Sequence, residues 1–483
     1  MLRRLSLALA VAAATTGMAW AESAPQAGKN DLVTVYQEAV KNNADLAAAR
    51  ANYDAISEVV PQARAGLLPG ISASAESLHT ETDIDSTAGT LSATRSGIAY
   101  QANLRQPLFR ADRWYQFQAA KATDQQYALQ LSATEQGLIL RSAETYFAVL
   151  RAQDALASTR AEEAAFKRQL DQANERFDVG LSDKTDVLEA QAGYDTARAN
   201  RILAQRAVED AFQALVTLTN REYATIEGIL HTLPVLAPTP NDAKAWVDTA
   251  AQQNLNLQAS NYAVAAAEEN LRQRKSGHAP TLEAVARYEK GDNDSLGYSN
   301  GLSLPGMPRY DDEVERTSIG LQLNVPIYSG GLTSSQVREA YHRLSQSEHE
   351  REALRRQVVE NTRNLHRAVN TDVETVQARK QSIISNQSAL EATEIGYQVG
   401  TRNIVDVLDA QRQLYSSVRN YNDARYDYII NNLRLKQAAG TLSQVDLEAL
   451  SGFLKPDYNP DQDFLPPDLA KTAEARLNTA PQF

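Results

Sequence analysis

The sequence predicts a mostly α-helical protein with an internal two-fold repeat and a membrane β-barrel at one end. Three observations predict this fold class. Helix-length stretches recur in two similar halves, polar and apolar residues alternate in four short segments, and a secretory leader stands at the N-terminus. Four strands are too few to close a membrane barrel, since the smallest single-chain barrels have about eight. We therefore expect several copies of the chain to contribute to one barrel.

Residues 1–21 have the pattern of a secretory signal peptide. Arg3 and Arg4 precede an apolar run, and Ala19-Trp20-Ala21 supplies the small residues of a cleavage site.

Without this leader, 46 basic residues remain against 60 acidic ones, a net charge of −14. An acidic exported protein binds nucleic acid poorly. The chain has no cysteine, so disulfides cannot stabilise it. No apolar run after residue 21 approaches the roughly 18–20 residues of a membrane helix, so we expect any passage through a membrane to be as a β-barrel.

One helical turn occurs twice, at residues 176–191 and 396–411. The two stretches keep a constant separation of 220 residues, which pairs Gly180 with Gly400. Glycine suits a tight turn because it has no Cβ, and Asn403 can cap the helix that restarts. A helical hairpin that recurs at fixed separation indicates an internal duplication.

The duplication divides the chain into four parts. These are a signal peptide at 1–21, a first structural repeat at 22–230, a second at 231–454 and a tail at 455–483. The tail carries five prolines and few large apolar residues, so we expect it to be disordered.

Long helices dominate both repeats. Two of them run from Pro107 to Gly180 and from Pro326 to Gly400, and each would be on the order of 110 Å long. Their composition, rich in Ala, Gln and Arg without a broad apolar face, favours a thin-walled cylinder with coiled-coil seams over a solid globule. Shorter helices are expected at 31–65, 184–217, 243–277 and 403–439. The segments at the helix breaks would form a belt around the cylinder, at 218–242 and 440–454.

Four segments alternate in the manner of strands, at residues 70–79, 97–105, 281–289 and 317–325. Each is about as long as the 9–11 residues of a tilted membrane strand. Polar loops are expected between them, at 80–95 and 290–316. The same alternation also suits a small soluble sheet with one face in water. The signal peptide and the repeat favour the barrel.

Two acids stand one helical turn apart, Asp406 and Asp409. Their spacing alone favours first-turn acids that offset the helix dipole. The six histidines provide no pair of ligands, since His342 and His349 are seven residues apart, and the sequence has no nucleophile motif or phosphate loop. We therefore expect no enzyme, no cofactor and no bound metal.

Several signatures of the sequence resemble one known family. They are Arg-Phe-Asp-Val-Gly-Leu at 176–181, Val-Gly-Thr-Arg-Asn-Ile-Val-Asp-Val-Leu-Asp-Ala at 399–410, Gln-Leu-Asp-Gln at 169–172 and Leu-Asn-Val-Pro-Ile-Tyr at 323–328. They are similar to the TolC family, the outer-membrane exit ducts of Gram-negative efflux and type I secretion systems. The similarity extends from Asp31 to about Ser451.

This resemblance implies an architecture and a set of partners. The chain would form a homotrimer with a 12-stranded barrel in the lipid of the outer membrane, continued by a long α-helical cylinder in the periplasm. A periplasmic adaptor protein would dock to it, and an inner-membrane pump or ABC exporter would supply the energy. No nucleic acid is implied.

The resemblance also implies roles for residues at the helix turns. Asp406 and Asp409 would form acidic rings at the pore constriction, which raise the local cation concentration. Links that hold the mouth shut would join Tyr397 and Arg402 to Thr185 and Asp186, and Gln169 to Glu394. The adaptor would dock on the two Val-Gly turns, at Val179, Gly180, Leu181, Val399, Gly400 and Thr401.

The expected function is therefore a trimeric outer-membrane channel-tunnel that exports drugs or secreted proteins through a gated, acidic periplasmic entrance. The alternative is a soluble periplasmic coiled-coil adaptor or scaffold that never enters the membrane. The four alternating segments favour the channel.

Overall fold

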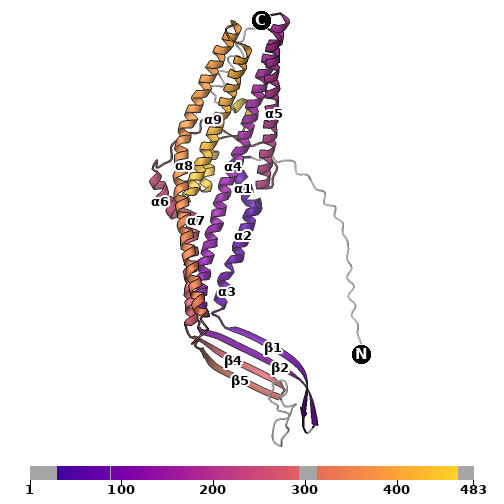
Figure 1. Ribbon diagram of the computed structural model, residues 1–483, viewed down its shortest axis with the longest axis vertical. Coiled ribbons are helices and arrows are strands. Elements are labelled where there is room, and N and C mark those ends of the chain that lie inside the picture. Colours follow the sequence, from indigo (N-terminus) through magenta and orange to yellow (C-terminus); the bar gives the residue numbers. More distant parts are fainter. Residues whose placement is uncertain (1–29, 88, 293–312, 466–483) are drawn as a thin grey trace, which may run out of the picture.

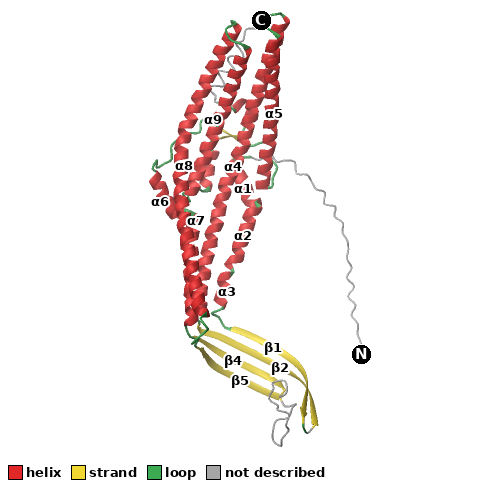
Figure 2. Ribbon diagram, viewed as in Figure 1, coloured by secondary structure: helices red, strands yellow, loops and turns green. Residues whose placement is uncertain are grey.

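The computed structural model describes residues 30–87, 89–292 and 313–465. Long helices run side by side along most of the molecule, and a sheet extends from one end of them (Figure 1). Figure 2 shows the four long strands gathered at that end, while helices occupy the rest of the long axis. The predicted signal peptide at 1–21 lies outside the described residues.

Two long helices set the length of the molecule. α4 (Ala111–Asp178) has 68 residues and α8 (Leu332–Gln398) has 67, about 100 Å each at a rise of ~1.5 Å per residue. α5 (Lys184–Thr219) returns from the end of α4, and α9 (Ile404–Ala438) returns from the end of α8. Among the described residues, no helix combines the length and the apolar character that crossing a membrane requires.

Two predicted helices, 31–65 and 243–277, are each broken by an asparagine. The Asn43 side-chain oxygen accepts the N–H of Leu46 at 2.9 Å, and that of Asn254 accepts the N–H of Leu257 at 3.0 Å. Asparagine is a strong N-cap, so it starts a new helix where the apolar spacing predicts a continuous one. The pieces are α1 (Leu32–Asn42), α2 (Ala44–Ser57), α3 (Val59–Ala65), α6 (Ala243–Gln253), α7 (Leu255–Lys275) and a 3-10 turn (Ser276–His278). The further break between α2 and α3 falls at Glu58, which makes no side-chain cap.

The sheet is antiparallel, with strand order β1-β2-β4-β5. All four predicted strands are present, and the first two are longer than expected. The expected loop at 80–95 is wrong, because pairing continues from Thr80 with Arg95 to Ser86 with Gly89. This hairpin is polar but rich in threonine, which is a good strand former. The strands are β1 (Gly70–Ser86), β2 (Gly89–Phe109), β4 (Thr281–Asp292) and β5 (Glu313–Asn324).

Two further boundaries differ at this end of the molecule. The expected loop at 290–316 is shorter, since β4 and β5 occupy both of its ends, and residues 293–312 lie outside the described part. The first long helix begins at Ala111 rather than at Pro107, because β2 continues to Phe109.

The sheet has one apolar and one polar face. Cross-strand pairing aligns Ile71 with Leu104, Leu104 with Ala286, and Ala286 with Ile319 in one row. The side chains at the two ends of this row are open to solvent, with Ile71 78% and Ile319 84% exposed. The adjacent row, whose side chains point to the other face, consists of Ser72, Asn103, Arg287 and Ser318.

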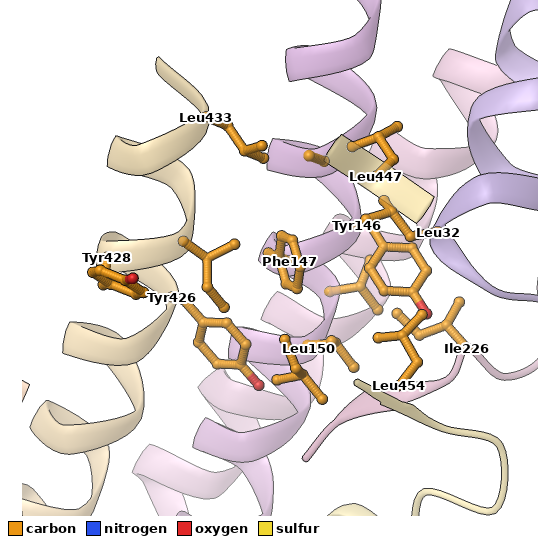
Figure 3. Close-up of a cluster of buried hydrophobic side chains, with 14 of the residues drawn as sticks. Leu32, Tyr146, Phe147, Leu150, Ile226, Tyr426, Tyr428, Leu433, Leu447 and Leu454 are labelled. Carbon is orange, nitrogen blue, oxygen red and sulfur yellow. The ribbon is translucent and has the colours of Figure 1, made fainter. Parts of the chain in front are cut away.

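The largest apolar core lies about midway along α4, around residues 139–157, and Figure 3 shows part of it. Tyr146, Phe147 and Leu150 of α4 pack there with Tyr426 and Leu433 of α9. Short elements at the helix breaks cover this core, and the strand pair β3 (Gly228–Ile229) with β6 (Leu454–Lys455) joins them. The other covering elements are α1, α10 (Gln444–Ser451) and α11 (Pro460–Asp463).

The expectation of a disordered tail from residue 455 is wrong for its first part, residues 455–465. Phe464 is 6% exposed, and its carbonyl accepts a hydrogen bond from the Asn422 side chain at 2.9 Å. The Lys455 ammonium lies 2.8 Å from the Asp463 carboxylate. Two aromatic residues, Tyr458 and Phe464, thus anchor a segment whose average composition is polar. Residues 466–483 lie outside the described part of the chain.

The anchored tail meets a buried acid, Asp154 of α4, which is 3% exposed. Its carboxylate accepts hydrogen bonds from the hydroxyls of Tyr426, at 2.8 Å, and of Tyr458. Burial raises the pKa of Asp154 from 3.8 to about 6, against the effect of these two donors. The folded chain therefore holds this proton more tightly than the unfolded chain does.

The raised pKa predicts the pH dependence of stability. A proton held more tightly in the folded state stabilises it fully below the unfolded pKa of 3.8, and the contribution is lost as pH rises through about 6. We expect the melting temperature of the purified protein, measured relative to Asp154→Asn, to fall between pH 4 and pH 7. Asp54→Asn, an exposed acid on α2, is the control and should give parallel curves. Parallel curves for Asp154→Asn as well would contradict a raised pKa.

Candidate functional site: the paired hairpin turns

The two long helices reverse direction at the end of the molecule farthest from the sheet (Figure 1). Both turns have the same geometry. Gly180 has φ 74° and Gly400 has φ 80°, in the left-handed region that favours glycine. The N–H of Leu181 reaches back to the Arg176 carbonyl at 2.8 Å, and the N–H of Thr401 reaches the Gly396 carbonyl at 2.8 Å. The two sequence signatures therefore encode two copies of one helix-ending motif.

Side-chain caps start the returning helices. The Asp183 carboxylate accepts the N–H of Asp186 at 3.1 Å before α5, and the predicted cap Asn403 accepts the N–H of Asp406 at 2.9 Å before α9. The Asp406 carboxylate in turn accepts a hydrogen bond from the N–H of Asn403 at 3.2 Å, which completes a capping box. Asp406 is thus a first-turn acid of α9 that also takes part in its cap.

A group of buried side chains joins the two hairpins just behind the turns, and we call it the tip cluster. It draws on α4, α5, α8 and α9, and its members are Phe166, Ala197, Tyr397, Ile404, Val407 and Leu408. Gly193 of α5 makes room for the Phe166 ring, since a Cβ at this glycine would lie 2.8 Å from Phe166 Cδ1. Apolar contact therefore holds the end of one hairpin against the end of the other.

Tyr397 is the member of the tip cluster that the sequence analysis places in the gate. Its side chain is 7% exposed, and the Cζ of Arg176 lies 4.8 Å from its ring centroid. Its buried hydroxyl has no hydrogen-bond partner among the described residues. Burial raises the pKa of this hydroxyl, Arg176 lowers it, and Asp186 lies near enough to raise it further. The sequence reasoning missed Arg176, although this residue belongs to the first turn signature.

The two predicted constriction acids are paired with arginines near them in sequence. Arg402 Nη1 lies 4.0 Å from Asp406 Oδ2, and Arg412 Nη1 lies 2.6 Å from Asp409 Oδ1. Within one chain Arg402 therefore faces Asp406 rather than Asp186, and its expected link to Asp186 stays a prediction. Surface pairs of this kind stabilise by only about 0–1 kcal/mol each.

The remaining gate residues lie on the predicted helices without forming the expected hydrogen bond. Gln169 is half-buried on α4, and its side-chain oxygen has no partner among the described residues. Burial raises the pKa of Glu394 on α8, and Arg168 acts in the opposite direction. Thr185 is exposed in the first turn of α5.

The predicted docking residues are open to solvent at both turns. Val179 is 69% exposed, Leu181 70% and Val399 68%. Gly180, Gly400 and Thr401 are exposed as well. The end of the molecule therefore carries apolar side chains that the chain itself does not cover.

No group of three or more metal-ligating side chains occurs in the described ranges.

Comparison with known proteins agrees with this geometry. The profile of the family described as outer membrane efflux protein matches residues 35–221 and 246–441. The outer membrane protein TolC of Vibrio cholerae is 38% identical over 90% of this chain and 94% of its own length. The alkaline protease secretion protein AprF of Pseudomonas aeruginosa is 27% identical over 87% of this chain and 86% of its own. The crystal structure of the outer membrane protein VceC from Vibrio cholerae matches with a TM-score of 0.72 at 16% identity, covering 85% of this chain and 96% of that one.

The helical hairpins, the two-faced sheet at the opposite end and these relatives define the class of protein. It is an outer-membrane channel of efflux and type I secretion systems, with its helical part in the periplasm. The chain belongs to the outer membrane efflux protein family. These matches to outer-membrane proteins do not favour the alternative of a soluble periplasmic adaptor or scaffold.

Substitution by alanine should have opposite effects on stability at two helical glycines, Gly193 beside the tip cluster and Gly137 on α4. In Gly193→Ala the new Cβ would press on the Phe166 ring, and we expect a loss of roughly 1–3 kcal/mol in unfolding free energy. In Gly137→Ala the nearest atom is 4.0 Å away, so a gain of about 0.5–1 kcal/mol is expected from helix propensity. Denaturant unfolding of the purified variants measures both. A Gly193→Ala variant as stable as Gly137→Ala would show that the close packing of Phe166 is unimportant.

Proposed function

We propose that three copies of this chain assemble into one channel-tunnel, in which their sheets close a twelve-stranded barrel in the outer membrane. The exposed apolar row that crosses all four strands is the observation that carries this proposal, because it suits contact with lipid. The polar face would then line the water-filled interior. β1 and β5 are the free edges of the sheet, and pairing them between chains would remove both edges.

The helical part would continue the barrel as a cylinder across the periplasm. Two helical hairpins per chain, related by the internal duplication, would contribute to its wall. The elements that cover the central core would form the belt. In this arrangement the paired turns lie at the periplasmic mouth, about 100 Å from the membrane by the length of α4.

We infer that the channel is a passive exit duct with no chemistry of its own. Relatives named for efflux and for protease secretion support drugs and secreted proteins as the cargo classes. A periplasmic adaptor would dock on the exposed turns, and an inner-membrane pump or ABC exporter would provide the energy.

The entrance would be gated and acidic. Asp406 and Asp409 would face the pore axis in three copies, and converging carboxylates concentrate cations. Tyr397, Arg402, Thr185, Asp186, Gln169 and Glu394 would supply the links that keep the mouth narrow. Each of these links contributes little free energy on its own, which suits a gate that a partner must open.

The assembly is tested by its electrical behaviour. The purified protein, shown to be a trimer by native mass spectrometry in detergent, is inserted into a planar lipid bilayer. We expect discrete single-channel currents that favour cations. A trimer that inserts without carrying current would contradict the channel, and a detergent-stable monomer would contradict the shared barrel.

The acidic constriction predicts a change in selectivity. Asp406→Asn together with Asp409→Asn removes six carboxylates from a trimeric mouth while the amide at 406 can still cap α9. We expect cation selectivity to fall and block by multivalent cations to weaken. Asp45→Asn with Asp54→Asn removes the same charge from α2 and should leave selectivity unchanged. Equal selectivity in the two double variants would contradict the acidic rings.

The docking surface predicts a loss of export without a loss of assembly. A Cβ at Gly400 meets no atom within 4 Å, so a large side chain would project into solvent at the turn and obstruct an adaptor. We expect Gly400→Trp to lower drug resistance to that of cells lacking the channel. Gly400→Ala imposes the same backbone strain without bulk and should retain most resistance. Normal resistance with Gly400→Trp at normal trimer levels would argue against docking at this turn.

A further inference from the structure

Arg176 is the cation that lies against the gate residue Tyr397. We propose that Arg176 is a positioning residue of the entrance, whose guanidinium holds the two hairpins of one chain together by stacking on the Tyr397 ring. The contact acts through the aromatic ring, and the tyrosine hydroxyl is not required. This inference rests on the gated entrance proposed above and deepens it by naming the link inside each chain.

The geometry of the pair is that of a cation–π contact. The Cζ of Arg176 lies 4.8 Å from the ring centroid, within the roughly 6 Å over which such contacts are significant. The ring is 7% exposed, and the Nε of Arg176 is buried without a hydrogen-bond partner among the described residues. A cation–π contact strengthens as its groups leave water. The ring is therefore the principal partner of this part of the guanidinium.

Both partners belong to the helix-ending motifs of the two turns. The Arg176 carbonyl accepts the N–H of Leu181 at 2.8 Å, and the Tyr397 carbonyl accepts the N–H of Gly400 at 3.1 Å. The side-chain contact therefore joins one turn motif directly to the other. A movement that separates the turns has to break the stack.

The hydroxyl of Tyr397 contributes little to this link. It is buried and has no hydrogen-bond partner among the described residues, although Asp186 is near enough to influence its pKa. Within one chain, the described residues give the hydroxyl no hydrogen-bond partner, whereas the ring lies against Arg176. Removal of the oxygen should therefore leave the contact with Arg176 intact.

A second arginine–aromatic pair lies beside the tip cluster, but its arginine is also ion-paired with a carboxylate. Arg412 lies 5.7 Å from the Phe166 ring, but its guanidinium also bonds the Asp409 carboxylate at 2.6 Å. Arg176 has no ion pair among the described residues, so its charge is directed at the ring. Of the two arginines that lie against rings of the tip cluster, Arg176 is thus the one whose main interaction crosses between the hairpins.

Single-channel recording of four variants in planar bilayers tests the proposal, with trimer content and melting temperature as folding controls. We expect Arg176→Gln and Tyr397→Leu to raise the ratio of open to closed dwell time by about 2- to 30-fold, the range spanned by exposed and desolvated cation–π contacts. Tyr397→Phe keeps the ring and should raise the ratio far less than Tyr397→Leu does. Arg176→Lys keeps the charge and should fall between wild type and Arg176→Gln. The double variant Arg176→Gln/Tyr397→Leu should open no more than either single one, because both remove the same contact.

Each other outcome has a defined meaning. Opening by Tyr397→Phe as large as that by Arg176→Gln would overturn the ring contact in favour of a hydroxyl link. Additive effects in the double variant, or wild-type gating in Arg176→Gln, would also overturn it. A wild-type trimer that carries no current would overturn the export channel itself, and this inference with it.

Discussion

The far end of α8 packs against the rest of the chain through the buried Tyr397 and the partly buried Leu390. After Ile383, no other residue of this helix is buried, whereas α4 also buries Phe166, Leu170 and Ala173 on its way to the turn. A helix this long gains most of its stability from packing rather than from propensity. The position of the second hairpin turn therefore depends on the burial of Tyr397 in the tip cluster. In the proposed gate, opening of the mouth would disturb this contact.

The packing of the chain differs between its middle, its sheet end and its turns. α4 and α9 meet around Tyr146, Phe147 and Tyr426, so the middle of the bundle is fixed while its end depends on a few contacts. The sheet at the opposite end exposes an apolar row, which assigns that end to the membrane in the proposed assembly. The buried cluster at the turns is thus much smaller than the one in the middle of the molecule, which is the pattern expected of elements that move in the proposed gate.

The sequence predicted those features that have a strong local signal. Glycine at φ near 80° and alternating apolar residues are short-range patterns, so Gly400 and the four strands were located correctly. The breaks at Asn43 and Asn254 were missed because apolar spacing continues across them, and because their amides also donate to the distant carbonyls of Leu218 and Ala438, which local patterns do not reveal. The ordered residues 455–465 were missed because Tyr458 and Phe464 anchor a segment of polar average composition. Arg176 lay within a recognised signature, but only packing shows that it stacks on Tyr397.

In the proposed entrance, the two turns of one chain form a fixed pair at rest through the Arg176–Tyr397 contact. The chain has no cysteine, so spin labels at Leu181→Cys and Val399→Cys, which are 70% and 68% exposed, report on the turns alone. Pulsed electron paramagnetic resonance on trimers diluted with unlabelled chains measures the distance between them. The account predicts one narrow distance distribution that broadens and lengthens in Arg176→Gln. A distribution that is already broad in the parent, or one unchanged by Arg176→Gln, would contradict it.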